Sequence, residues 1–229
     1  MRRNRLRAAV PVALLAGALA VGVSACGSSN SSSDNSTGSA TPSASSTAPL
    51  ATVPDLSNGV STAVKLDPSF LSALKSLNLT PGTVGKATLD ASTGVVSFPI
   101  TGGHVTYYKP GGPTEPYVQG IINHDGSGLS LSAGGTTVEL TNFTINPGTS
   151  ILTGDVSANG QSVAKQADLF FLNGSTLQPL QTQGNDAILT GTKVSIYPSA
   201  AQLLDKTFNT TAVTPYFPVG VATITIATS

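Results

Sequence analysis

Histidine and cysteine are the scarcest reactive residues of this 229-residue chain, which contains two histidines and one cysteine. His124 is followed by Asp125 in a glycine-rich run. A neutral imidazole can bind a metal or a ligand near neutral pH, so His124 and Asp125 are the candidate ligand-binding residues. Two structural roles remain open beside this one. His124 can instead be tied to a neighbouring backbone carbonyl, and Asp125 in Asp-Gly-Ser-Gly can cap a turn.

Other kinds of site find little support in the sequence. His104 lies beside Gly102-Gly103 and is expected to face solvent from a strand. Two histidines at this separation, without an acidic cluster, match no zinc or calcium spacing, so no metal site is predicted. The chain also lacks a phosphate-binding loop and a Gly-x-Ser-x-Gly elbow. We therefore expect a protein that is not an enzyme and has no catalytic residues.

The N-terminus reads as an export signal. Arg2, Arg3, Arg5 and Arg7 precede an apolar run from Ala8 to Val23, and Val-Ser-Ala then stands directly before Cys26. The apolar run is too short for a comfortable membrane span. Val-Ser-Ala-Cys resembles the lipobox of bacterial lipoproteins, which implies cleavage before Cys26 and a diacylglyceryl lipid, with acyl chains such as palmitate, on its thiol. An ordinary secretory signal is the alternative.

The chain after Cys26 begins with a low-complexity segment. Thirteen of the 23 residues from Gly27 to Pro49 are Ser or Thr, which predicts a disordered tether without a core. Four of the eleven basic residues lie in the leader, whereas all eleven acidic residues follow Cys26, so the remainder carries seven bases against eleven acids, a formal charge of −4. Without a basic patch, nucleic-acid binding is not expected. We divide the chain into 1–25 (signal peptide), 26–50 (lipidated cysteine and linker) and 51–229 (folded domain).

The folded domain has the pattern of an all-β protein. Only 10% of all residues are charged, and short alternating apolar and polar runs stand between Gly, Asn and Pro turns. We predict an antiparallel β-sandwich of about ten to twelve strands with two short helices. The helices are expected over 67–77, with Asp67 as N-cap, and over 198–208.

The strands follow from the same alternation. Within 120–156, His124 and Asp125 are expected in the first turn between short strands. Val138 and Leu140 share one parity while Phe143 and Ile145 share the other, so a β-bulge or bend is predicted at Thr141-Asn142. Further strands are predicted over 84–89, 95–100, 104–108, 117–122, 167–172, 193–197 and 219–227.

A family resemblance follows from these motifs. The runs FPITGG, NHDGSGLSLS, VELTNFTI and ILTGDV, with the closing helix and strand, look like the HtaA-type domain of actinobacterial haem-uptake proteins. The resemblance spans most of 70–226. It implies an antiparallel sandwich with two small helices, and haem held by a tyrosine of the N-terminal helix with support from the histidine that matches His124.

One position departs from that pattern. Where the family reads Ser-Phe-Arg-Ser-Tyr, this chain reads Ser69-Phe70-Leu71-Ser72-Ala73, and alanine has no donor atom for iron. Tyr107, Tyr108 or Tyr117 can replace that tyrosine only if it lies near His124. No cofactor follows from the residues themselves, and haem is the one that the resemblance implies.

Two functions remain. The first is a secreted, lipid-anchored protein on the extracytoplasmic face of the cell membrane that binds haem or another small hydrophobic ligand. The alternative is a structural or adhesive surface lipoprotein without a small-molecule site. In both, the lipid on Cys26 makes the membrane a partner, and the oligomeric state stays open.

Overall fold

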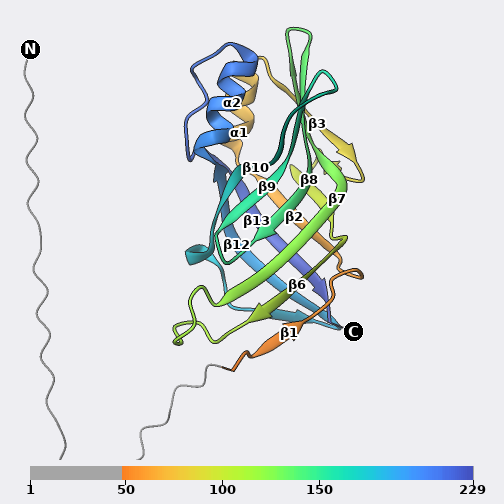
Figure 1. Cartoon of the computed structure of the whole chain (residues 1–229), viewed down its shortest axis with the longest axis vertical. Helices are drawn as coiled ribbons and strands as arrows, with labels where there is room; N and C mark the ends of the chain where they lie inside the picture. The colour runs from red at the N-terminus through yellow and green to blue at the C-terminus, as the bar shows by residue number, and fades with distance from the viewer. Residues whose placement is uncertain (1–47, 229) are drawn as a thin grey trace, which may run out of the picture. The chain divides into compact units, whose positions relative to one another are not determined.

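The computed structural model describes residues 48–228, and these residues form one antiparallel sheet with two short helices and a single 3-10 turn (Figure 1). The expected all-β class with two short helices is confirmed. The predicted signal peptide, Cys26 and most of the linker lie outside the described residues. Contacts divide the chain into Met1–Ser43 and Ala44–Ser229, and the second unit contains every described element and the whole described core. Such a unit is expected to fold on its own.

Thirteen strands pair in the order β1-β6-β7-β8-β9-β10-β12-β13-β2-β5-β4, while β3 pairs with β7 and β11 with β12. The sheet curls so that its inner face encloses a core. The strands are β1 (Ala51–Val53), β2 (Ser61–Leu66), β3 (Thr80–Gly85), β4 (Thr88–Asp90), β5 (Val95–Pro99), β6 (Gly102–Tyr107), β7 (Val118–Ala133), β8 (Thr136–Asn146), β9 (Ile151–Ala158), β10 (Gln161–Asn173), β11 (Gln181–Gln183), β12 (Asp186–Ile196) and β13 (Pro218–Ala227).

Strand β7 corrects one prediction. It runs without interruption for 16 residues, so His124 and Asp125 lie inside a strand and not in a turn. The glycine-rich run after them makes a bulge, where the pairing with β8 shifts register between His124 and Gly128. β6 pairs with the first half of β7 and β3 with the second half. The glycines that indicated a turn therefore bend a long strand between two neighbours.

The predicted bulge at Thr141-Asn142 is confirmed. The pairing of β8 with β9 shifts between Thr141 and Thr144, and Asn142 adopts a φ of 53°. Asn tolerates this left-handed conformation better than most side chains. The bulges of β7 and β8 are joined, because Asn142 Oδ1 accepts a hydrogen bond from Gly126 N at 3.0 Å.

Both helices form where the sequence predicts them. α1 (Pro68–Ser76) starts after Asp67, whose carboxylate accepts hydrogen bonds from Ser69 N at 2.8 Å and Ser69 Oγ at 2.6 Å. α2 (Pro198–Phe208) is followed by its C-cap Asn209, which has a left-handed φ of 51°. The turn η1 (Gly174–Thr176) follows β10. α1 and α2 both lie toward the same end of the curled sheet (Figure 1).

The other predicted strands are present, with one exception. The range 84–89 is not one strand, because β3 ends at Gly85 and β4 begins at Thr88. Gly85 has a φ of 62°, and Lys86 N donates a hydrogen bond to Gly126 O, which ends β3 against the bulge of β7. Two short strands with different partners therefore replace one.

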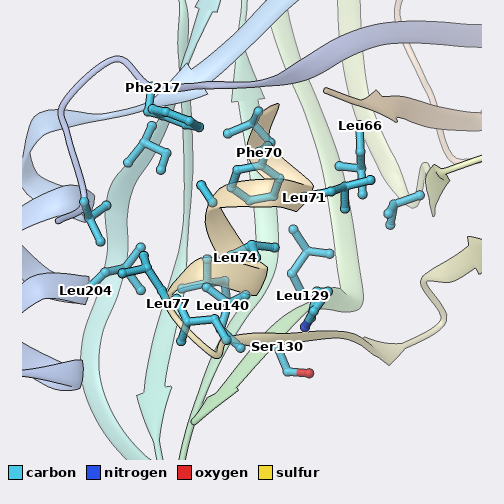
Figure 2. Close-up of a pocket in the computed structure, with 18 of the residues that line it drawn as sticks. Leu66, Phe70, Leu71, Leu74, Leu77, Leu129, Ser130, Leu140, Leu204 and Phe217 are labelled. Atoms are coloured by element: carbon cyan, nitrogen blue, oxygen red, sulfur yellow. The ribbon is translucent and has the colours of Figure 1, made fainter. Parts of the chain in front are cut away.

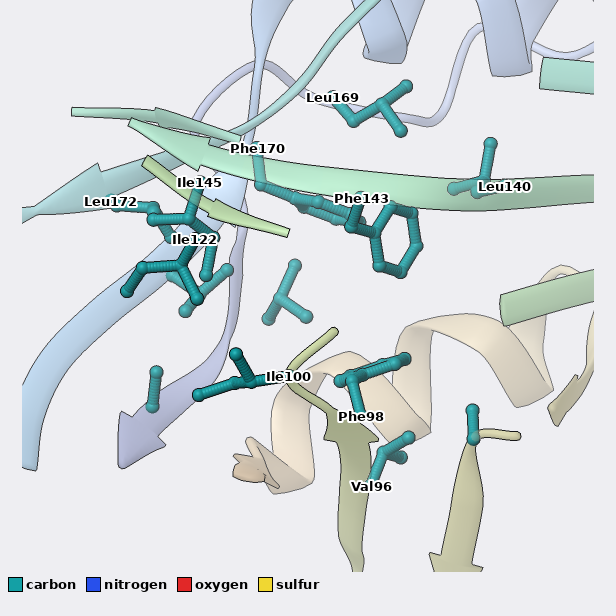
Figure 3. Close-up of a cluster of buried hydrophobic side chains, with 14 of the residues drawn as sticks. Val96, Phe98, Ile100, Ile122, Leu140, Phe143, Ile145, Leu169, Phe170 and Leu172 are labelled. Atoms are coloured by element: carbon teal, nitrogen blue, oxygen red, sulfur yellow. The ribbon is translucent and has the colours of Figure 1, made fainter. Parts of the chain in front are cut away.

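Aromatic side chains form the centre of the core (Figure 3). Phe143 is 2% exposed, and its ring packs edge-on against those of Phe98 and Phe170, with centroids 5.4 Å and 6.4 Å away. These three rings come from β8, β5 and β10, so they join strands that are not neighbours in the sheet order. Among residues 48–228, no helix is long and apolar enough to span a bilayer.

Candidate functional site

His124 points from β7 into the core and is 1% exposed. Its Nδ1 lies 3.0 Å from the carbonyl oxygen of Pro99 and its Nε2 lies 3.1 Å from Thr62 Oγ1. A carbonyl oxygen can only accept, so Nδ1 carries the ring hydrogen and donates it to Pro99. In the neutral ring Nε2 then accepts a hydrogen bond from the Thr62 hydroxyl. His124 thus joins β7 to β5 and β2.

Burial lowers the pKa of His124 below its ordinary value, and it outweighs the opposing effects of the Pro99 and Phe98 carbonyls and the charge of Asp125. The ring is therefore neutral at physiological pH. Both nitrogens are already engaged in hydrogen bonds. In this arrangement His124 offers no free lone pair to an iron atom, and it adopts the carbonyl-bonded role that the sequence left open.

Asp125 points the other way. It is exposed, its Oδ2 accepts a 3.3 Å hydrogen bond from Thr101 Oγ1, and its backbone N donates to the same hydroxyl at 2.9 Å. Neighbouring residues of a strand face opposite sides of the sheet, so the structure does not bring the two predicted site residues together. Their part in ligand binding stays a prediction. His104 is exposed on β6, as expected.

A cavity of about 290 Å³ lies next to this core, between α1, α2 and the sheet (Figure 2). Its wall is made mostly of leucine, valine, alanine and phenylalanine side chains. From α1 come Phe70, Ala73 and Leu74, and from its C-cap Leu77; from the sheet come Leu129, Leu140 and Phe170; from α2 comes Leu204 and from the loop after it Phe217. The hydroxyl-bearing residues in the wall are Thr83, Ser130 and Thr214, and none of the described residues in it is charged.

Exposed apolar residues mark where the cavity reaches the surface. Leu71 on α1 is 40% exposed and Leu89 on β4 is 43% exposed, and both belong to the wall. Leucines with this exposure are usually scattered singly. Here two of them border one hollow, so we infer an opening near Leu71 of α1 and Leu89 of β4.

A second, smaller cavity of about 40 Å³ adjoins the first. Its wall includes His124 and Thr62, together with Phe98, Phe143 and Ala222. The walls of the two cavities share five residues, namely Leu66, Val96, Leu129, Phe170 and Val219. His124 therefore lies beyond the inner end of the main cavity, with its nitrogens turned to Thr62 and Pro99.

The residues that would hold haem in the manner of the resemblance are not assembled. Ala73 lies in the wall of the main cavity, at the position where the resemblance places a tyrosine. Tyr107 and Tyr117 pack edge to face with centroids 5.8 Å apart, and neither they nor Tyr108 line either cavity. No group of three His, Cys, Asp or Glu side chains within residues 48–228 could hold a metal ion.

Reasoning from the sequence missed this cavity, because its wall comes from two helices, several strands and a loop that lie far apart in the chain. One signal was present. Ala73 is a small residue on α1, and it leaves space in the cavity wall where a larger side chain would fill it.

Comparisons with known proteins concern the fold. No protein-family model and no curated protein matches the chain. Among solved structures, it is similar to the C-terminal domain of HtaA from Corynebacterium glutamicum, with 17% sequence identity and a TM-score of 0.51 over 77% of this chain and 98% of that one. A domain-swapped dimer of a histidine-to-alanine variant of the same domain matches with 17% identity and a TM-score of 0.44, over 70% and 91% of the two chains. The chain therefore shares the fold of the HtaA C-terminal domain, and the resemblance is confirmed at the level of fold.

Proposed function

We propose that this chain is a lipid-anchored binding protein of the cell envelope that holds a small apolar ligand in the cavity between α1, α2 and the sheet. The observation that carries the proposal is the wall of that cavity, which is apolar apart from a few hydroxyls and opens between Leu71 and Leu89. Its volume of about 290 Å³ is near the lower end of the range typical of small-molecule sites, about 300–1,000 Å³.

The free energy of binding would come from burial of apolar surface, about 25 cal/mol for each Å² removed from water. No charged group lines the cavity within the described residues, so a charged ligand would lose hydration without gaining a partner. This chemistry favours binding over catalysis, and we propose no enzymatic activity.

Haem, the ligand implied by the resemblance, does not fit these residues in the family manner. Ala73 supplies no iron ligand, and His124 would have to give up its hydrogen bond with Thr62 or with Pro99 to supply one. The cavity wall also offers no cation for the haem propionates. We therefore place an apolar molecule that needs no metal ligation ahead of haem.

The location follows from the leader. We propose that a lipid on Cys26 holds the protein on the extracytoplasmic face of the cell membrane and that the Ser/Thr-rich tether separates the binding domain from the lipid surface. We propose the membrane as the partner of the lipid, and we do not propose nucleic-acid binding.

The test uses the segment Ala44–Ser229 and the dye N-phenyl-1-naphthylamine, whose fluorescence rises in apolar sites. We expect saturable, stoichiometric binding. Ala73→Phe puts a ring into the cavity and should weaken dye binding at least about tenfold, equivalent to 1.4 kcal/mol. Ser72→Phe, at the exposed neighbouring position of the same helix, is the matched control and should leave binding unchanged.

A parallel haem titration separates the alternatives. A stoichiometric Soret shift that disappears in His124→Ala would overturn the proposal in favour of haem. If neither dye nor haem binds, the proposal fails and the structural or adhesive role remains.

A further inference from the structure

Two adjoining cavities of unequal size lie one behind the other between the surface and His124. The outer one measures about 290 Å³ and the inner one about 40 Å³, and five side chains line both. A site of this form has a wide outer part and an inner part with space only for a thin group. The end of a hydrocarbon chain fits such an inner part, whereas a fused ring system does not.

The chemistry of the inner part supports the same ligand class. Its wall carries two polar side chains, His124 and Thr192, besides the hydroxyl of Thr62. Thr62 and His124 are hydrogen-bonded to each other, and the second ring nitrogen of His124 is bonded to Pro99. Every buried side-chain nitrogen and oxygen of the described residues has a hydrogen-bond partner. The inner end therefore has no unsatisfied group for a polar ligand, and a methyl terminus costs nothing there.

The opening suits the polar end of such a ligand. Leu71, Pro81 and Leu89 are exposed there, and the residues Thr83 and Thr214 place hydroxyl-bearing side chains at exposed positions of the wall. A carboxylate or ester at this end would stay in water and keep its hydration. A ligand with such a polar end can therefore bind although no charged group lines the described wall.

From these observations we propose that the ligand is a single unbranched acyl chain, which enters between α1 and β4 with its methyl end directed toward His124. This inference rests on the proposed function and names the ligand class for the same cavity. A free fatty acid and a lysophospholipid present the same chain, so both are sources to be compared. Two acyl chains of one lipid would exceed the space.

The test is displacement of N-phenyl-1-naphthylamine from Ala44–Ser229 by octanoate, dodecanoate and hexadecanoate, each below its micelle concentration. Affinity should rise with chain length, up to about fourfold for each methylene buried, and level off when the hollow is full. A lysophospholipid with a hexadecanoyl chain should compete like hexadecanoate if the head group stays in water. Stronger binding of one of the two would identify the source.

Variants locate the methyl end. Ala222 is 3% exposed and lines the small cavity but not the main one. Ala222→Val should therefore fill the small cavity and weaken hexadecanoate binding about tenfold. The binding of octanoate and of the dye should stay unchanged. Val64→Ile, also in that wall, fills the same space from β2 and serves if Ala222→Val does not fold. Ala63→Val is the control, because Ala63 lines neither cavity.

Two results would overturn the acyl-chain assignment while leaving the binding function intact. One is that affinity depends on acyl-chain length in Ala222→Val and in Val64→Ile in the same way as in the wild-type segment. The other is displacement of the dye by a rigid polycycle, such as cholesterol hemisuccinate, as effectively as by hexadecanoate. Absence of dye binding to the wild-type segment would instead remove the proposed function itself.

Discussion

His124 is the largest polar side chain among the fully buried residues of the described chain, and its neutral ring is matched to its neighbours. The tautomer with its hydrogen on Nδ1 suits both neighbours: Nδ1 donates to the Pro99 carbonyl, and Nε2 accepts a hydrogen bond from the Thr62 hydroxyl. Protonation would put a hydrogen on Nε2 and a charge into an apolar core. Thr62 would then have to accept from the ring, and the charge would find no carboxylate inside the core, since Asp125 is on the outer face.

This environment predicts how stability depends on pH. The pKa of His124 is lowered in the folded chain, whereas in the unfolded chain it returns to about 6.5. Below that pH the unfolded state binds more protons, so the free energy of unfolding falls by up to about 1.4 kcal/mol per pH unit until the folded state is also protonated. Above about pH 6.5 this contribution is constant.

Urea unfolding of Ala44–Ser229 from about pH 7.5 to about pH 5.5, above the range where carboxylates titrate, measures the effect. The double variant Thr62→Val/His124→Leu removes both polar partners and should flatten the slope. His104→Gln, at an exposed position, should retain it. A wild-type slope that persists in the double variant would assign the pH dependence to another group.

The bulges of neighbouring strands are tied together by a polar network on the outer side of the sheet. Asn142 of β8 donates to Asp155 Oδ2 of β9 at 3.0 Å and accepts from Gly126 of β7. Asp155 also receives hydrogen bonds from Lys165 Nζ at 3.0 Å and Gln166 N at 3.1 Å, both on β10. These bonds lower the pKa of the Asp155 carboxyl, the bond from Asn142 most of all. The network thereby links the irregular positions of four strands, β7 to β10.

Substitution of Asn142 should separate side-chain bonding from backbone conformation. Asn142→Gly keeps the left-handed φ and loses two hydrogen bonds, so we expect a loss of about 1–3 kcal/mol in the free energy of unfolding. Asn142→Ala should lose about 1 kcal/mol more, because alanine is strained at this φ. Urea unfolding curves of both variants give the comparison. Equal stability of the alanine and glycine variants would show that the positive φ contributes nothing.

The chain as a whole joins a proposed anchor to a binding domain. If Cys26 carries the lipid, Cys26→Ser should move the protein from the membrane pellet to the soluble fraction of cells, because acyl chains contribute about 0.8 kcal/mol per buried methylene. Ser28→Ala, in the adjoining tether, should leave it in the pellet. Mass spectrometry of the N-terminal peptide provides the direct check. An unmodified thiol still joined to the arginine-rich leader would contradict both the anchor and the location.

The sequence by itself determined the class of fold, both helices and most strands, because alternation, proline positions and caps such as Asp67 act over a few residues. It also predicted the bulge at Thr141-Asn142 from a change of parity. It misplaced His124 and Asp125 in a turn, since glycines that end one strand can equally bend a longer one, and only pairing with β3, β6 and β8 distinguishes the two. The tertiary structure decided that His124 is satisfied by Thr62 and Pro99, and that Ala73 faces a cavity. Both depend on side chains brought together from distant strands and helices, which no local pattern records.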